Sequence, residues 1–96
     1  MIEQDGNGLR VTGTMLIADA SALLEAGRGF LRSGTGAAVV LDLSAAEETD
    51  SSALSVVFGL LRTARERGVS FQIAHPPASM ISQAALYGVS DSLPLA

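Results

Sequence analysis

The feature that most constrains the fold is an almost unbroken apolar run from Ala38 to Leu43, in which Asp42 is the one charged residue. Strands that are buried in the middle of a sheet have such continuous apolar sequences, whereas half-exposed strands alternate between apolar and polar residues. The run is therefore predicted to be a buried central strand.

Helix patterns and further strand patterns alternate around this run. The predicted elements are, in chain order, strands at 2–4 and 9–13 joined by a turn at 5–8, a helix at 19–33, the strand at 38–43, a helix at 51–67, a strand at 70–74, a helix from about 77 to 87, and a short last strand around 93. Asp19 is predicted to cap the first helix and Gly34 to end it. The order β-β-α-β-α-β-α-(β) predicts one α/β domain over residues 1–96, with a mixed sheet of about four to five strands covered by about three helices.

Charge and composition disfavour several classes of function. Six arginines, no lysine and ten acidic residues give a net charge of −4, and the arginines form no dense run, so nucleic-acid binding is not expected. The chain has no cysteine and no phosphate-binding glycine loop, and its single histidine, His75, is interpreted as a turn residue, so neither a metal nor a cofactor is expected. No apolar run approaches the roughly 20 residues that span a bilayer, and no signal peptide is visible. We therefore expect a cytoplasmic protein without direct membrane insertion.

The start of the second predicted helix carries two hydroxyls and a carboxylate, in Asp50, Ser51 and Ser52. Free backbone N–H groups and the positive end of the helix dipole meet solvent there, which suits an anion, a phosphate ester or a partner protein. The same residues are also favoured helix caps, and from the motif alone capping is the better interpretation. Just before them, Glu47 and Glu48 are expected to lie with Asp50 in an acidic loop.

The outward face of this helix is unusual because its first two turns carry small residues rather than lysine and glutamate. Projection at 100° per residue places Ala53, Leu54, Val57, Phe58, Leu60, Leu61 and Ala64 on the core side. Ser52, Ser55, Val56, Gly59, Arg62, Thr63 and Glu66 fall on the opposite face. We interpret that face as a docking surface centred on Val56 and Gly59, although small residues there could also be merely tolerated.

The layout of these elements resembles the STAS domain family, over nearly all 96 residues. The resemblance rests on the hairpin start, the Leu41-Asp42-Leu43-Ser44 strand end, the Asp50-Ser51-Ser52 helix start and the return strand after Gly68. In the anti-sigma-factor antagonists of this family, the second hydroxyl residue of an Asp-Ser-Ser-Gly motif accepts phosphate from a partner kinase. That position corresponds to Ser52, but Ala53 stands where the family usually has glycine.

A second branch is more similar, namely the STAS subunit of the bacterial maintenance-of-lipid-asymmetry (Mla) phospholipid ABC transporter. Leu86-Tyr87 and Leu93-Pro94 match the arrangement in the C-terminal part of that subunit, and Ser51 corresponds to its functional hydroxyl. The resemblance implies a non-enzymatic protein that binds the cytoplasmic ATPase subunit of the transporter, at the inner membrane. The helix start and the outward face together give the predicted partner-binding residues, which are Asp50, Ser51, Ser52, Ser55, Val56, Gly59, Arg62 and Thr63. The alternative is an anti-sigma-factor antagonist that is regulated by phosphorylation of Ser52, and an enzyme is a distant third.

Overall fold

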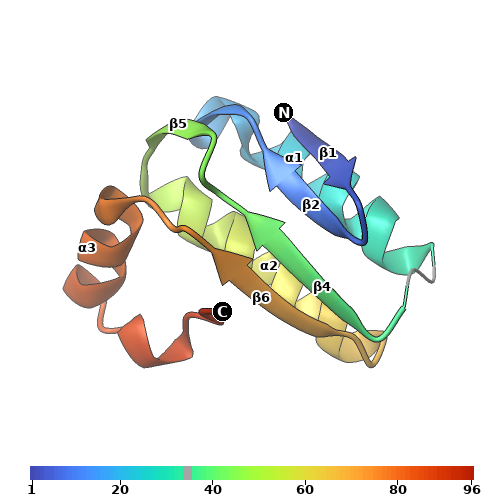
Figure 1. Cartoon of the computed structure of the whole chain (residues 1–96). Coiled ribbons are helices and arrows are strands. Elements are labelled where there is room, and N and C mark those ends of the chain that lie inside the picture. Colours follow the sequence, from blue (N-terminus) through green and yellow to red (C-terminus); the bar gives the residue numbers. More distant parts are fainter. Residues whose placement is uncertain (34–35) are drawn as a thin grey trace.

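The computed structural model describes residues 1–33 and 36–96, and its centre is a four-stranded mixed sheet (Figure 1). The strands are β1 (Ile2–Asp5), β2 (Gly8–Val11), β4 (Ala38–Asp42) and β6 (Ser70–Ala74), in the order β1-β2-β4-β6. Strand β1 pairs with β2 antiparallel, whereas β2, β4 and β6 are parallel to one another. The predicted hairpin, the central position of the apolar run and the mixed sheet are thus confirmed.

A second, two-stranded parallel sheet joins β3 (Gly13–Met15) to β5 (Ala46–Thr49). Neither strand was predicted from the sequence. The prediction that Glu47 and Glu48 lie in a loop was wrong. Both glutamates belong to β5 and are exposed. A short strand with two successive glutamates has no apolar alternation, so the pattern that identifies strands in a sequence is missing there.

Three helices complete the domain: α1 (Ile17–Arg32), α2 (Ser51–Glu66) and α3 (Ala78–Leu86), followed by a single 3₁₀ turn at Ser90–Ser92. In Figure 1, α1 and α2 lie behind the four-stranded sheet, whereas α3 lies beside its β6 edge. Helices α1 and α2 run parallel to each other, as shown by hydrogen bonds that join their N-terminal ends and their C-terminal ends. Ile17 N–H donates to Asp50 at the N-terminal end, and the Arg67 guanidinium donates to the Arg32 carbonyl at the C-terminal end.

Two predicted boundaries differ in the structure. Helix α1 begins at Ile17, two residues before the predicted cap, and Asp19 lies inside its first turn. From there the Asp19 carboxylate accepts hydrogen bonds from Leu16 N–H at 3.0 Å and from the Thr14 hydroxyl at 2.6 Å, so it still closes the helix start. Gly34, the predicted end of this helix, lies outside the described residues. The predicted last strand is reduced to one parallel bridge between Leu95 and Ile73.

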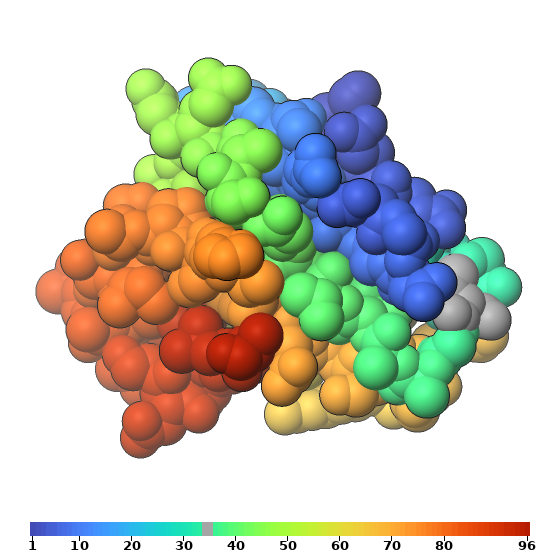
Figure 2. All heavy atoms as spheres, in the orientation of Figure 1, coloured from blue at the N-terminus to red at the C-terminus, as the bar shows by residue number. Residues whose placement is uncertain are grey.

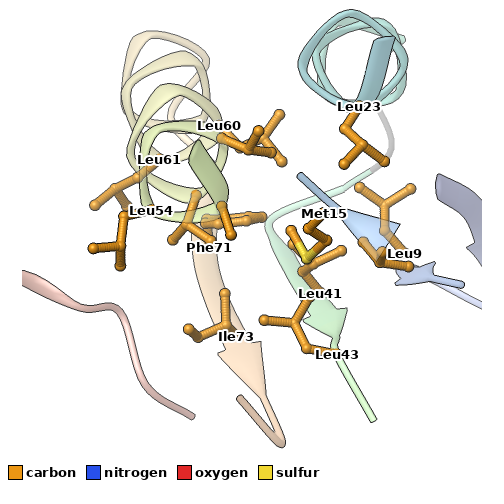
Figure 3. Close-up of a cluster of buried hydrophobic side chains, with 14 of the residues drawn as sticks. Leu9, Met15, Leu23, Leu41, Leu43, Leu54, Leu60, Leu61, Phe71 and Ile73 are labelled. Atoms are coloured by element: carbon orange, nitrogen blue, oxygen red, sulfur yellow. The ribbon is translucent and has the colours of Figure 1, made fainter. Parts of the chain in front are cut away.

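The hydrophobic core lies between the sheet and the two long helices (Figure 3). Leu60 of α2 and Leu23 of α1 face the buried side chains of β2, β4 and β6, and Leu41 and Ile73 are fully buried. The opposite face of the sheet carries no helix (Figures 1 and 2). Val40, on that face, is 40% exposed, so the prediction that the central strand is buried was wrong for one of its two sides. None of the described helices is long and apolar enough to cross a membrane.

Candidate functional site

Asp50 occupies the N-cap of α2 and uses both of its carboxylate oxygens for backbone hydrogen bonds. Oδ1 accepts from Ser52 N–H at 2.8 Å, and Oδ2 accepts from Ile17 N–H, at the start of α1, at 3.0 Å. The hydrogen bond from Ser52 holds the pKa of the Asp50 carboxyl below its ordinary value, and the bond from Ile17 acts in the same direction. Asp50 therefore joins the two helix N-termini, so that its carboxylate serves to position the site.

The joined helix ends form a small surface with a mixed character. Ser51, the first residue of α2, is exposed, and Ser55 is exposed one turn later. Ser52 is only half-buried, and the side chain of Ile17 is 77% exposed beside them. Because the Asp50 carboxylate already accepts hydrogen bonds from both helix N-termini, the serine hydroxyls are the hydrogen-bonding groups left for a partner. The surface therefore suits hydrogen-bond acceptors that arrive with an apolar neighbour.

Part of the predicted docking face of α2, including its centre at Val56, is buried, and for this part the prediction was wrong, whereas Ser55 and Arg62 on the same face are exposed. Val56 and Thr63 are buried, at 2% and 3% exposure. A Cβ added at Gly59 would lie 2.7 Å from Leu24 Cδ1, so this glycine packs against α1. The Thr63 hydroxyl, in turn, accepts a hydrogen bond of 3.2 Å from Arg28 Nε of α1. The small residues allow two helices of the same chain to approach closely, which single-sequence analysis cannot distinguish from a surface that receives a partner.

A different side of α2 is open, namely the side that faces the C-terminal part of the chain. A hollow of about 300 Å³ lies between Ser51, Leu54, Ser55 and Phe58 on α2 and Tyr87 and Val89 beyond α3. A cleft of about 730 Å³ adjoins it, lined by Phe58, Leu61, Arg62, Arg65 and Glu66 on α2 and by Asp91, Ser92, Leu93 and Pro94. Because Phe58 lines both, we treat them as one feature and name it the α2 cleft.

The α2 cleft includes predicted and unpredicted residues. Ser51, Ser55 and Arg62 were predicted as partner-binding residues and lie on it. Phe58 was assigned to the core side and is half-buried, so that part of its side chain lines the cleft. Tyr87 was noted only for family resemblance, although it is 59% exposed and its neighbour Leu86 is 78% exposed. Large apolar residues that are exposed in this way are typical of interaction surfaces.

His75, the single histidine, lies in a turn after β6 with a φ of 55° and is exposed. Its Nδ1 lies 3.3 Å from Asp42 Oδ1 at the end of β4. The Asp42 carboxyl has a lowered pKa, chiefly because it accepts a hydrogen bond from Ser44 N–H. Within residues 1–33 and 36–96, no group of three or more histidine, aspartate or glutamate side chains is placed to hold a metal ion.

Comparisons with known proteins agree with this architecture. A family model described as "Mlab, STAS domain" matches residues 1–95. A putative anti-sigma factor antagonist from Thermotoga maritima has a similar structure, with a TM-score of 0.77, 17% identity, and coverage of 99% of this chain and 83% of the other. An anti-sigma factor antagonist from Mycobacterium paratuberculosis also gives a TM-score of 0.77, with 22% identity and coverage of 99% and 81%. A sulfate transporter family protein from Wolinella succinogenes gives 0.68, with 13% identity and coverage of 95% and 75%.

At these identities, the solved structures establish the fold alone. No curated protein matches the sequence. The family model, in contrast, matches the chain from Met1 almost to its last residue. On that match, and with the expected sheet and helices in place, the chain belongs to the STAS domain family.

Proposed function

We propose that this protein is a non-enzymatic binding module, and that it is an accessory subunit bound to the cytoplasmic ATPase subunit of a phospholipid-transporting ABC complex. The observation that carries the proposal is the match of residues 1–95 to the family model described as "Mlab, STAS domain". STAS domains are mostly binding or regulatory modules, which agrees with the absence of an enzyme motif in the sequence.

The surface around the α2 N-terminus supports a role in binding. The serines Ser51 and Ser55 are exposed and can form hydrogen bonds with a partner. Exposed apolar surface is contributed by Ile17, Leu86 and Tyr87. Interfaces typically combine an apolar centre with hydrogen-bonding groups at the rim, and aromatic residues are enriched at their centres. A partner that covers the start of α2 and the end of α3 would remove these apolar side chains from water.

The alternative is an anti-sigma-factor antagonist whose partner kinase phosphorylates Ser52. The similarity of the fold to solved antagonists favours it. Two observations disfavour this alternative. Ser52 is half-buried, whereas Ser51 is exposed. Ala53, which replaces the family's usual glycine, is a buried core residue. Intact-mass measurement of the protein from its native cell tests the alternative, since reproducible phosphate on Ser52 would support the antagonist and overturn the preferred proposal.

A direct test is calorimetric titration of the purified protein with the purified ATPase subunit from the same organism. We expect the wild type to bind, and we expect Ser51→Tyr and Ser55→Tyr to weaken binding because a ring at these exposed positions would obstruct a partner. Ser21→Tyr is the matched control, since Ser21 is an exposed serine on α1. Absence of wild-type binding would refute the proposal, and wild-type binding with equal effects of the three substitutions would place the interface away from the α2 N-terminus.

A further inference from the structure

The α2 cleft extends along one side of helix α2. Its wall on α2 extends from Ser51 to Arg65, which at 1.5 Å per residue corresponds to about 21 Å of helix. The opposite wall is formed by Tyr87, Val89 and the segment from Asp91 to Pro94. About six residues of extended chain have the same length, at roughly 3.3 Å per residue. The length of the cleft therefore matches a peptide segment of about six residues.

The chemistry of the cleft changes along its length. Serine hydroxyls line the end near the α2 N-terminus. The middle is apolar, and Figure 3 shows Leu54 and Leu61 projecting from α2 on the side that faces away from α1. Arg62 and Arg65 line the other end, where both are exposed. A segment that fills the cleft would thus contact apolar side chains in its middle and two guanidinium groups at one end.

The two guanidinium groups are available to a partner. Neither Arg62 nor Arg65 forms an ion pair within the described residues, although Glu66 and Asp91 also line this end. Their surroundings are basic as well. Five of the six arginines of the chain lie in or directly after the C-terminal halves of α1 and α2, where the only acidic residues are Glu25 and Glu66. The lining of this end holds two arginines and two acidic residues, but with its surroundings it counts five arginines against Glu25, Glu66 and Asp91, and this excess attracts acidic groups.

We infer that the α2 cleft receives a segment of the partner protein that combines bulky apolar side chains with acidic residues, oriented so that the acidic residues meet Arg62 and Arg65. The inference rests on the proposed function, because the partner is the ATPase subunit, and it adds which surface is used and what chemistry the partner supplies. Paired arginines favour carboxylates, since a guanidinium can donate two parallel hydrogen bonds to one carboxylate.

The test has two steps, both with the full-length protein and the purified ATPase subunit. A photocrosslinking residue is first placed at Ser55, and mass spectrometry of the product identifies the segment of the ATPase subunit that lies in the cleft. We expect a segment with aspartate or glutamate next to large apolar residues. Crosslinks to a basic segment, or scattered over the ATPase surface, would overturn the inference.

Charge reversal then tests the orientation. The double variant Arg62→Glu/Arg65→Glu is expected to weaken binding by at least about tenfold, because truncating or reversing a charge at an interface is costly. The control is Arg32→Glu/Arg67→Glu, which makes the same change in net charge outside the cleft and also removes the hydrogen bond from Arg67 to the Arg32 carbonyl, so any loss of stability is measured and compared separately. Circular dichroism and thermal melting establish that both variants fold.

The outcomes separate the two proposals. If the wild type does not bind the ATPase subunit, the proposed function fails and the inference fails with it. If the wild type binds and the two double variants behave alike, the proposed function stands and the cleft is not the receiving surface. Binding of the wild type to phosphatidylglycerol vesicles, lost in the cleft variant alone, would assign the arginines to a lipid surface and would also overturn the inference.

Discussion

Two glycines of α1, two residues apart, are expected to respond in opposite ways to the same substitution. Gly27 is buried, and a Cβ added there would lie 2.5 Å from Cδ2 and 3.0 Å from Cδ1 of Leu60. Gly29 is exposed, and an added Cβ would have no atom within 4 Å. Both are helical, so alanine at either position removes the same conformational cost of glycine, about 1 kcal/mol.

The difference between the two sites comes from packing. Leu60 is fully buried between α1, α2 and the sheet, so it has little room to move away from a new methyl group. Forcing an extra methyl group into a filled core costs about 1–3 kcal/mol. The gain in helix propensity offsets part of this cost, so Gly27→Ala should lower the free energy of unfolding by about 0–2 kcal/mol. Gly29→Ala has only the gain and should raise the free energy of unfolding by about 0.5–1 kcal/mol.

Urea unfolding of the two variants at pH 7 gives these free energies directly. For a domain of this size, a difference of 1 kcal/mol also corresponds to a shift of about 4–8 °C in Tm. We expect the Gly29 variant to melt above the wild type and the Gly27 variant to melt at or below it. Equal stabilisation by both substitutions would refute the reasoning, because it would mean that α1 and α2 are not in close contact at Gly27.

The fold was largely predictable because its main elements carry strong periodic patterns. The helix at α2 was predicted within a residue or two, since Asp50 and Gly68 mark its ends and the apolar residues between them recur at helical spacing. The short strands β3 and β5 were missed because each has only three or four residues and little apolar alternation. Their pairing depends on tertiary position, which a local pattern does not contain.

The face of α2 that touches α1 was misassigned for a physical reason. One helical projection gives two sides, whereas this helix has three kinds of neighbour: the sheet, α1 and the C-terminal segment. Gly59 and Thr63 contact α1 and Val56 is buried, and small residues are suited both to close helix packing and to a partner surface. Ser51, Ser55 and Arg62 lie on the third side and remain predicted partner-binding residues, whereas the exposure predicted for Val56 and Thr63 was wrong.

Two further substitutions test this arrangement. Gly59→Arg should lower the free energy of unfolding more than Gly59→Ala does. The Cβ of either side chain would lie 2.7 Å from Leu24 Cδ1, and arginine adds further atoms beyond that Cβ. Thermal melting of the two variants measures the difference. The last expectation concerns Asp50, whose carboxyl pKa is lowered in the folded state mainly by the hydrogen bond from Ser52 N–H. A folded pKa below the unfolded value of 3.8 means that this contribution to stability is complete above the unfolded pKa and is lost as the pH falls through the folded pKa. Asp50→Asn should therefore be less stable than the wild type at pH 7 and should lose less stability on acidification to pH 3. Glu47→Gln is the control, because it removes one carboxylate from the exposed strand β5. Urea unfolding measures the free energy of unfolding of both variants at pH 7 and pH 3. If Asp50→Asn and Glu47→Gln have the same values, the Asp50 carboxylate does not hold the two helix N-termini together.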